Sequence, residues 1–378
     1  MHRIAYVIGE LGKGGAEYQL HELLRHLDRE RFEPRVFVLA PGGWWIEPIR
    51  RLGVVVEELP RRGSADVARL ARLRAALARF APHVLHTILW PGNCYGRLAA
   101  IGLGIPVVIA AERNVAPYRR WQIVVERALA RTTDAWLVNC EAIADWLTAQ
   151  ERIARARIHV IPNGIDLGRV PPFVLDRRAA RAAAAFPAER RLVAQVGRLE
   201  PQKDYPTYLH AMQAVAAEVA DVDFLVVGEG SLRAELEELA GRLGIADRVR
   251  FTGVRHDVPA LLGGVDVAVL SSIFEGFPNV VVEAMAAGAV GVAANVGGCG
   301  EVLVDGESGL LVPPRAPDAV AAAVVRVLGD PALAARLASA ARRRVEEHFA
   351  IDVMARRTSD VYRLLLRPKS PAPSIAAA

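Results

Sequence analysis

The chain has 378 residues, of which 52% are apolar and 24% charged, a globular balance that excludes wholesale disorder. No apolar stretch is long enough to span a membrane, and the start of the chain lacks the parts of a signal peptide. The net charge is +5, but aromatic and basic residues are not interleaved as in a single-strand nucleic-acid binder. Three distant cysteines, Cys94, Cys140 and Cys299, favour neither a disulfide framework nor a metal cluster. We therefore expect a cytoplasmic protein that binds no nucleic acid and no metal.

Short β-branched runs alternate with helical patterns over residues 1–170, which is typical of a parallel sheet covered by helices. The continuous apolar character of the strands predicts that both faces of the sheet are buried. The predicted strands are 3–8, 36–40, 54–58, 84–87, 107–111, 135–139 and 158–161, and the predicted helices are 15–28, 66–80, 93–103, 118–131 and 141–150.

The same alternation restarts at residues 188–347, after a segment rich in proline, arginine and alanine (171–187) that we interpret as a linker with a first helix. Two doubly wound α/β domains in tandem imply a cleft, and such sheets bind ligands beyond the carboxyl ends of their strands. A last helix is predicted at 351–366, and the tail 368–378 is expected to be disordered. The predicted strands are 192–197, 223–228, 249–252, 265–270, 290–294 and 309–312, and the predicted helices are 204–219, 231–243, 279–287, 317–328 and 331–347.

Two loops that follow predicted strands carry features of an anion site. The glycine-rich segment Gly9–Glu17 opens a helix, where bare amides and the helix dipole attract anions, although a tight turn explains it equally well. Arg198 and Lys203 lie in the loop between a strand that ends at Gly197 and a helix capped by Asp204. Two such cations can converge on a diphosphate, and the alternative is a pair of solvated surface charges.

A third loop places two carboxylates around the start of a helix. Glu275 lies in the loop, Pro278 is placed where a helix begins, and Glu283 follows about one turn into that helix. The amides of the helix start suit a phosphate, whereas carboxylates suit sugar hydroxyls. Alternatively, Glu283 merely complements the helix dipole and Glu275 caps the helix.

Together these elements resemble glycosyltransferase family 4, over roughly residues 1–366. The motifs that carry the resemblance are Gly-Gly-Ala-Glu near the start, Gly197-Arg198 with Lys203, Gly228-Glu229-Gly230, Glu275 with Glu283, and Gly297-Gly298-x-x-Glu301. The resemblance implies the GT-B fold of two Rossmann-like domains, with helix 351–366 crossing back to the first one. It also implies a retaining enzyme that uses a nucleotide-sugar donor and no cofactor.

The resemblance assigns roles to individual residues. Arg198 and Lys203 would hold the donor diphosphate and stabilise the leaving nucleotide, which makes a metal ion unnecessary. Glu283 would accept hydrogen bonds from the ribose, and Glu275 would bind the donor sugar near the reacting carbon. The remaining donor contacts are expected from Gly14, Gly15, Gly197, Glu229, Thr252, Gly276, Phe277, Asn279 and Val280.

The chain departs from its relatives where the acceptor is expected. Ile88 and Arg113 stand where many relatives carry histidines, which leaves His86 and Glu112 as candidates for acceptor binding or proton handling. His86 is equally well explained as a structural histidine, whereas Glu112 is better placed, at a strand end. The sequence between Thr87 and Arg97, together with Glu112-Arg113-Asn114, resembles a bacterial branch of the family that is involved in polysaccharide assembly.

The acceptor is expected to be a glycan or a lipid-linked molecule. The basic helix 66–80 could lie on the inner face of an anionic membrane, although an amphipathic helix packed on the sheet is the favoured interpretation. Two other functions stay open on the residues alone: a sugar-nucleotide epimerase of the same fold, and a non-catalytic subunit that binds sugar nucleotides.

Overall fold

The computed structural model describes residues 1–61, 66, 68–114, 119–170, 177–183 and 186–367. Its chain divides into two compact units. The first comprises Met1–Val138, Ala144–Ile161 and the C-terminal helix from Met354, and the second comprises Asn139–Ile143 and Pro162–Val353. The predicted disordered tail and most of the predicted linker lie outside the described residues.

The first unit is built on a seven-stranded parallel sheet with the strand order β3-β2-β1-β4-β5-β6-β7. Its order reverses between β1 and β4, which creates a topological switch point. Central strands such as β4 and β5 are buried along their whole length, as their apolar runs predict. The strands are β1 (His2–Ile8), β2 (Phe32–Val38), β3 (Val55–Glu58), β4 (Val84–Ile88), β5 (Val107–Glu112), β6 (Ala135–Val138) and β7 (Ile158–Val160).

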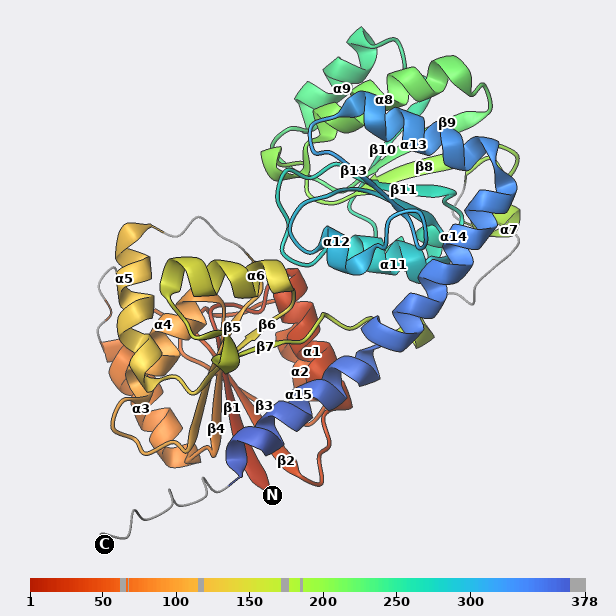
Figure 1. Cartoon of the computed structure of the whole chain (residues 1–378). Helices are drawn as coiled ribbons and strands as arrows, with labels where there is room; N and C mark the ends of the chain where they lie inside the picture. The colour runs from red at the N-terminus through yellow and green to blue at the C-terminus, as the bar shows by residue number, and fades with distance from the viewer. Residues whose placement is uncertain (62–65, 67, 115–118, 171–176, 184–185, 368–378) are drawn as a thin grey trace, which may run out of the picture. The chain divides into compact units, whose positions relative to one another are not determined.

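Helices cover this sheet (Figure 1). Strand β2 starts earlier than predicted and runs through Pro34, which is tolerated because β3 pairs with β2 only from Arg35 onward. Helix α4 starts at Leu89 instead of residue 93, and the short α2 was not predicted. The helices are α1 (Gly15–His26), α2 (Ile46–Arg51), α3 (Ala68–Phe80), α4 (Leu89–Ala100), α5 (Arg120–Leu129) and α6 (Glu141–Trp146), with single turns η1 (Ala130–Thr132), η2 (Leu147–Glu151) and η3 (Arg155–Arg157).

The second unit holds a six-stranded parallel sheet with the order β10-β9-β8-β11-β12-β13 and a switch point between β8 and β11. Its strands are β8 (Arg191–Val196), β9 (Val222–Val227), β10 (Val249–Gly253), β11 (Val267–Leu270), β12 (Val290–Ala294) and β13 (Leu310–Val312). Its helices are α7 (Arg177–Ala183), α8 (Tyr205–Glu218), α9 (Arg233–Arg242), α10 (Val258–Gly263), α11 (Asn279–Ala287), α12 (Cys299–Val302), α13 (Pro317–Gly329) and α14 (Pro331–Arg344), with turns η4 (Leu167–Arg169), η5 (Pro201–Lys203) and η6 (Val345–Phe349). Both units are thus doubly wound α/β folds, as predicted.

The C-terminal helix α15 (Ile351–Leu366) supplies part of the first unit's core (Figure 1). The Tyr362 side chain is fully buried, with its hydroxyl 2.6 Å from His86 Nδ1 and 3.1 Å from the hydroxyl of Tyr6. Leu364, by contrast, is half-exposed, although its apolar character favoured burial. Among the described helices, none is both long and apolar enough to cross a membrane.

Candidate functional site

The switch point of the second sheet brings together residues that lie far apart in the sequence. Strands β8 and β11 are neighbours in the sheet, and the loops that leave their carboxyl ends carry Lys203 and Glu275 respectively. The Lys203 ammonium lies 2.5 Å from Glu275 Oε1, and both side chains are largely buried. Open α/β sheets bind their ligands at this position. Two of the predicted site residues therefore form one ion pair beyond the carboxyl ends of the strands, where a ligand is expected.

Backbone hydrogen bonds fasten these two loops to each other. The amide of Ile273 donates to the carbonyl of Gln202 (3.0 Å), and the Gln202 side-chain amide donates to the carbonyl of Phe274 (3.0 Å). The ion pair therefore rests on two loops whose backbones are directly connected.

A buried polar pair, Gln195 and Ser271, holds the turn that follows Lys203. Asp204 adopts a left-handed conformation (φ 46°, ψ 50°), which costs energy for a residue other than glycine. The Ser271 hydroxyl lies 2.9 Å from the carbonyl oxygen of Lys203 and 2.8 Å from that of Asp204. The Gln195 side-chain amide donates to the same Lys203 carbonyl (2.9 Å). Sequence reasoning missed both residues, although a glutamine inside an otherwise apolar strand was an available signal.

Asp204 does not cap its helix in the expected way. It occupies the position before α8, but its carboxylate accepts a hydrogen bond from the Thr207 hydroxyl (2.7 Å) and none from a helix amide. The left-handed backbone of Asp204 turns its side chain away from the geometry of an N-cap acceptor.

Glycines allow a second pair of loops to approach this site closely. Gly297 has a φ of +50°, and a Cβ atom there would overlap the carbonyl oxygen of Glu275. The neighbouring Gly298 amide donates to the Gly276 carbonyl (2.9 Å). The Gly-Gly pair of the last motif thus supports the backbone that carries Glu275.

Helix α11 starts where the sequence predicted. One backbone amide at its start, that of Asn279, is not free for a ligand as expected. The helix begins at Asn279 directly after Pro278. The Asn279 amide donates to the carbonyl of Phe277 (3.0 Å), so it is engaged within its own turn, contrary to expectation. For the amides of Gly276 and Phe277 no hydrogen-bond partner is found among the described residues, and these two groups can serve an anion. Contacts of Val280 with a donor stay a prediction.

Glu283 lies on the first turns of α11 and is partly buried. Burial raises the pKa of its carboxyl group from 4.5 to about 7, while the positive charge of Arg169 opposes this shift. The side chain is therefore close to half-protonated at neutral pH, and a partner that donates hydrogen bonds to it will favour the ionised form.

The outer part of the site is open to solvent. Arg198 is exposed, and the described residues provide no hydrogen bond or ion pair to its side chain. Glu229, in contrast, forms an ion pair with Arg233, and the Thr252 hydroxyl lies 3.3 Å from the Gly253 carbonyl. The roles of Arg198, Glu229 and Thr252, like that of Gly197 at the strand end, stay predictions.

In the first unit, Gly14 and Gly15 lie at the start of α1, as expected. A Cβ atom on Gly14 would overlap the carboxylate of Glu17, so the missing side chain leaves room for that group.

Glu112 ends β5 and is only 3% exposed, and it accepts a hydrogen bond of 2.5 Å from the Asn93 side chain. Asn93 thus fixes the orientation of the Glu112 carboxylate.

His86 has a structural position, which resolves the alternatives that the sequence left open. Its side chain is fully buried against Tyr362. Burial, with a smaller effect from the charge of Arg113, lowers the pKa of His86 from 6.5 to about 3. It therefore stays neutral at physiological pH and is a poor candidate for proton transfer.

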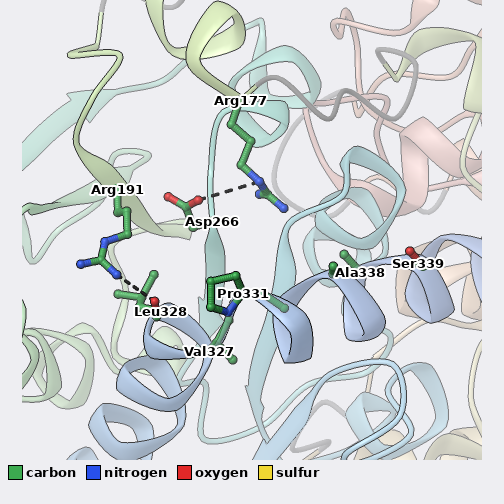
Figure 2. A pocket seen from close by; sticks show the side chains of 10 residues that line it. Arg177, Arg191, Asp266, Val327, Leu328, Pro331, Ala338 and Ser339 are labelled. Carbon is green, nitrogen blue, oxygen red and sulfur yellow. Dashed lines mark hydrogen bonds and ion pairs between the residues drawn. The ribbon is translucent and has the colours of Figure 1, made fainter.

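A separate cavity of about 320 Å³ lies at the amino ends of strands β8 and β11 in the second sheet (Figure 2). Arg191 and Asp266 line it where β8 and β11 begin, and Arg177 lies 3.8 Å from Asp266. The Arg191 guanidinium donates to the Leu328 carbonyl (2.8 Å). Because these groups lie at the amino ends of the strands and already bind one another, we do not assign the cavity to the donor.

Comparison with known proteins agrees with this geometry. Residues 13–169 match the family described as Glycosyltransferase Family 4, and residues 176–344 match Glycosyl transferases group 1. The chain is 31% identical to D-inositol 3-phosphate glycosyltransferase of Streptomyces avermitilis, over 92% of this chain and 82% of the relative. It is 37% identical to glycogen synthase of Mycobacterium tuberculosis, over 63% and 56% of the two chains.

Solved structures share the fold across almost the whole chain. HepE of Anabaena, crystallised with UDP, matches with a TM-score of 0.86 and 22% identity over 96% of this chain and 100% of its own. Crystals of HepE with UDP-glucose match with a TM-score of 0.85 at the same identity and coverage. Taken with the site described above, these similarities show that the chain belongs to glycosyltransferase family 4 and is a glycosyltransferase of the GT-B type.

Proposed function

We propose that the chain is a retaining, metal-independent enzyme that transfers a sugar from a nucleoside-diphosphate sugar to a glycan or lipid-linked acceptor of bacterial surface polysaccharide synthesis. It would work in the cytoplasm or at the inner face of the membrane. The observation that carries this proposal is the ion pair between Lys203 and Glu275 at the switch point of the second sheet, beside the exposed Arg198. The UDP and UDP-glucose in the crystals of HepE make these nucleotides the first candidates.

The two cations have a direct role in bond cleavage. As the bond between the sugar C1 and the phosphate oxygen breaks, negative charge grows on the diphosphate, and Arg198 and Lys203 would stabilise it. An ammonium group has three N–H donors. Lys203 can therefore keep its contact with Glu275 while it binds a phosphate oxygen, so that the ion pair positions both groups before the donor arrives.

The carboxylates would divide the recognition of the donor between them. Glu275 would bind a sugar hydroxyl close to C1, and Glu283 would accept hydrogen bonds from the ribose. The acceptor hydroxyl would attack C1 on the face that the nucleotide leaves, and its proton would pass to the departing phosphate oxygen. Atoms and charges balance in this step without a metal ion. Glu112 is the candidate for contact with the acceptor.

The Glu275→Gln substitution tests the proposal. Its amide oxygen still accepts a hydrogen bond from Lys203, so UDP should bind within a factor of a few of the wild type. Turnover of UDP-glucose, including its slow hydrolysis, should fall by about 10²-fold or more because the contact near C1 loses its charge. Titration calorimetry with UDP and a coupled assay for UDP release measure the two quantities.

Glu218→Gln is the matched control, since Glu218 is an exposed carboxylate at the end of α8. It should change neither quantity. The proposal fails if the wild-type protein binds none of UDP, GDP and ADP, or if Glu275→Gln turns over the donor at the wild-type rate.

A further inference from the structure

The segment that follows β7 begins the long stretch of the second unit at Pro162, and the proposed function assigns it no role. It is held by the segment that leads into α15. The Ile165 amide donates to the Phe349 carbonyl (2.8 Å), and the Ile351 amide donates to the Ile165 carbonyl (2.9 Å). The two segments through which the chain passes between its units are therefore hydrogen-bonded to each other inside the second one.

Both segments contact the start of α11, where the donor is proposed to bind. The Phe277 ring meets the Phe349 ring edge to face, with centres 5.6 Å apart. The Asn163 side chain donates a hydrogen bond from Nδ2 to Oδ1 of Asn279, at 2.8 Å. Asn163 is only 5% exposed, and Asn279 is partly buried. This bond fastens the first residue of α11 to a segment that lies 116 positions earlier in the sequence.

The segment that carries Asn163 also acts on Glu283. Arg169, in turn η4, supplies the positive charge that opposes the rise in the pKa of the Glu283 carboxyl group. The Asp166 carboxylate accepts a hydrogen bond from the Gly168 amide (2.9 Å), which holds the turn that carries Arg169. Residues of this one segment therefore influence Glu283 as well as the first residue of α11.

The hydrogen-bond donors that Asn279 has left for a ligand are on its side chain. Its backbone amide is engaged by the Phe277 carbonyl (3.0 Å), and its Oδ1 accepts from Asn163. Its Nδ2 carries two N–H groups, and these form no hydrogen bond in the described part of the chain. The amides of Gly276 and Phe277 lie at the same helix start. The side chain of Asn279 therefore adds donors where an anionic oxygen is expected.

Building on the proposed function, we infer that Asn163 is a positioning residue for the donor. It holds Oδ1 of Asn279, so that the N–H groups of the Asn279 side chain are presented to the donor diphosphate. Because the amide group is planar, fixing its oxygen also fixes the direction of its N–H groups. The donor then meets these groups already oriented. Without Asn163 the Asn279 side chain is free to rotate, and the nucleotide has to order it on binding.

A double-mutant cycle on the full chain tests this inference, with UDP as the probe in titration calorimetry. Asn279→Ala should weaken UDP binding by about 10-fold, because a phosphate oxygen loses its hydrogen bonds to the amide. Asn163→Ala should weaken it by about 3-fold or more. In the Asn279→Ala background, Asn163→Ala should have no further effect, because the group that it positions is already gone.

Two results of the cycle would overturn the inference. One is wild-type affinity for UDP in Asn163→Ala. The other is an equal loss from Asn163→Ala in both backgrounds, since Asn163 would then act on UDP binding independently of Asn279. A purely structural role of the segment gives this second result.

Variants of the same shape test the direction of the hydrogen bond. Asn279→Asp has no side-chain N–H and brings a negative charge, so it should weaken UDP binding by about 100-fold or more. Asn163→Asp cannot donate to Oδ1 and accepts from Nδ2 instead, which turns the Asn279 amide around. It should weaken UDP binding at least as much as Asn163→Ala. If Asn279→Asp binds UDP as the wild type does, its side chain does not donate to the ligand and the inference is wrong.

The control is Gln213→Ala, which removes an exposed side-chain amide from α8 and should leave the affinity for UDP unchanged. Circular dichroism checks that each variant is folded, and Asn163→Asp takes the place of an insoluble Asn163→Ala in the cycle. A wild-type protein that binds none of UDP, GDP and ADP refutes the proposed function and this inference with it. Intact UDP binding with independent losses in the cycle refutes this inference alone.

Discussion

At the scale of single residues, Glu283 shows how a buried carboxyl group lowers the stability of the folded protein. Its pKa rises on folding from 4.5 to about 7 because the carboxyl group is desolvated. Between these two pH values the folded chain holds a proton that the unfolded chain has released. The stability contributed by this residue therefore falls as the pH rises through that window and stays low above it.

Glu283→Gln should reverse this loss. The neutral amide has no ionised form to bury, so the variant should match the wild type near pH 5 and exceed it at pH 8, by about 1–3 kcal/mol. Thermal denaturation across this pH range measures the difference. UDP affinity should change in the opposite sense, with a deficit in the variant that is larger at pH 8 than at pH 6. A stability difference that does not vary with pH would contradict the assignment.

Arg198 and Lys203 are predicted to recognise the diphosphate rather than the nucleoside. Arg198→Ala and Lys203→Ala should each lower the turnover of UDP-glucose by about 10²–10³-fold, because the charge that they face grows in the transition state. UDP should lose more affinity than UMP in calorimetry. Arg326→Ala, at an exposed arginine of α13, is the control. Equal losses for UDP and UMP would show that the two cations do not hold the terminal phosphate.

At the scale of elements, the loops that carry the site are held by buried polar contacts. Ser271→Ala removes the hydroxyl that lies within 2.9 Å of the Lys203 and Asp204 carbonyls. We expect kcat/KM to fall about 10-fold, since the ammonium is then less well placed, while UMP affinity stays unchanged. Ser271→Thr, which keeps the hydroxyl, should recover most of the activity. A variant that loses stability but keeps full kcat/KM would assign Ser271 a purely structural role.

The sequence predicted the long elements and the places of the loops that carry Lys203 and Glu275 well, because apolar periodicity and helix-start signals are local. It missed α2, α10 and α12, each too short to show a period. It also missed the support of the Lys203 turn by Ser271, because that contact joins the loop after β11 to the loop after β8, and the two loops become neighbours only through the sheet order. The family resemblance was enough to assign candidate roles to individual residues. The ion pair between Lys203 and Glu275 could be seen only in the three-dimensional structure.

At the scale of the whole molecule, the first unit depends on a helix from the far end of the chain. From Met354 onward α15 belongs to that unit, where the side chains of Met354, Val361 and Tyr362 are buried. Burial of three such side chains contributes roughly 1.5–3 kcal/mol each. Their sum is comparable to the net stability of a domain, about 5–15 kcal/mol.

A chain that stops after Asp352 should therefore lose the cooperative unfolding of its first unit. Calorimetry should show only the transition of the second unit, or the protein should be insoluble on expression. A chain that stops after Arg367 keeps every described residue of α15 and should unfold like the full chain. In the shorter chain His86 also loses the hydrogen bond of 2.6 Å to the Tyr362 hydroxyl. If the shorter chain shows both transitions at unchanged temperatures, α15 is not part of the first unit's core.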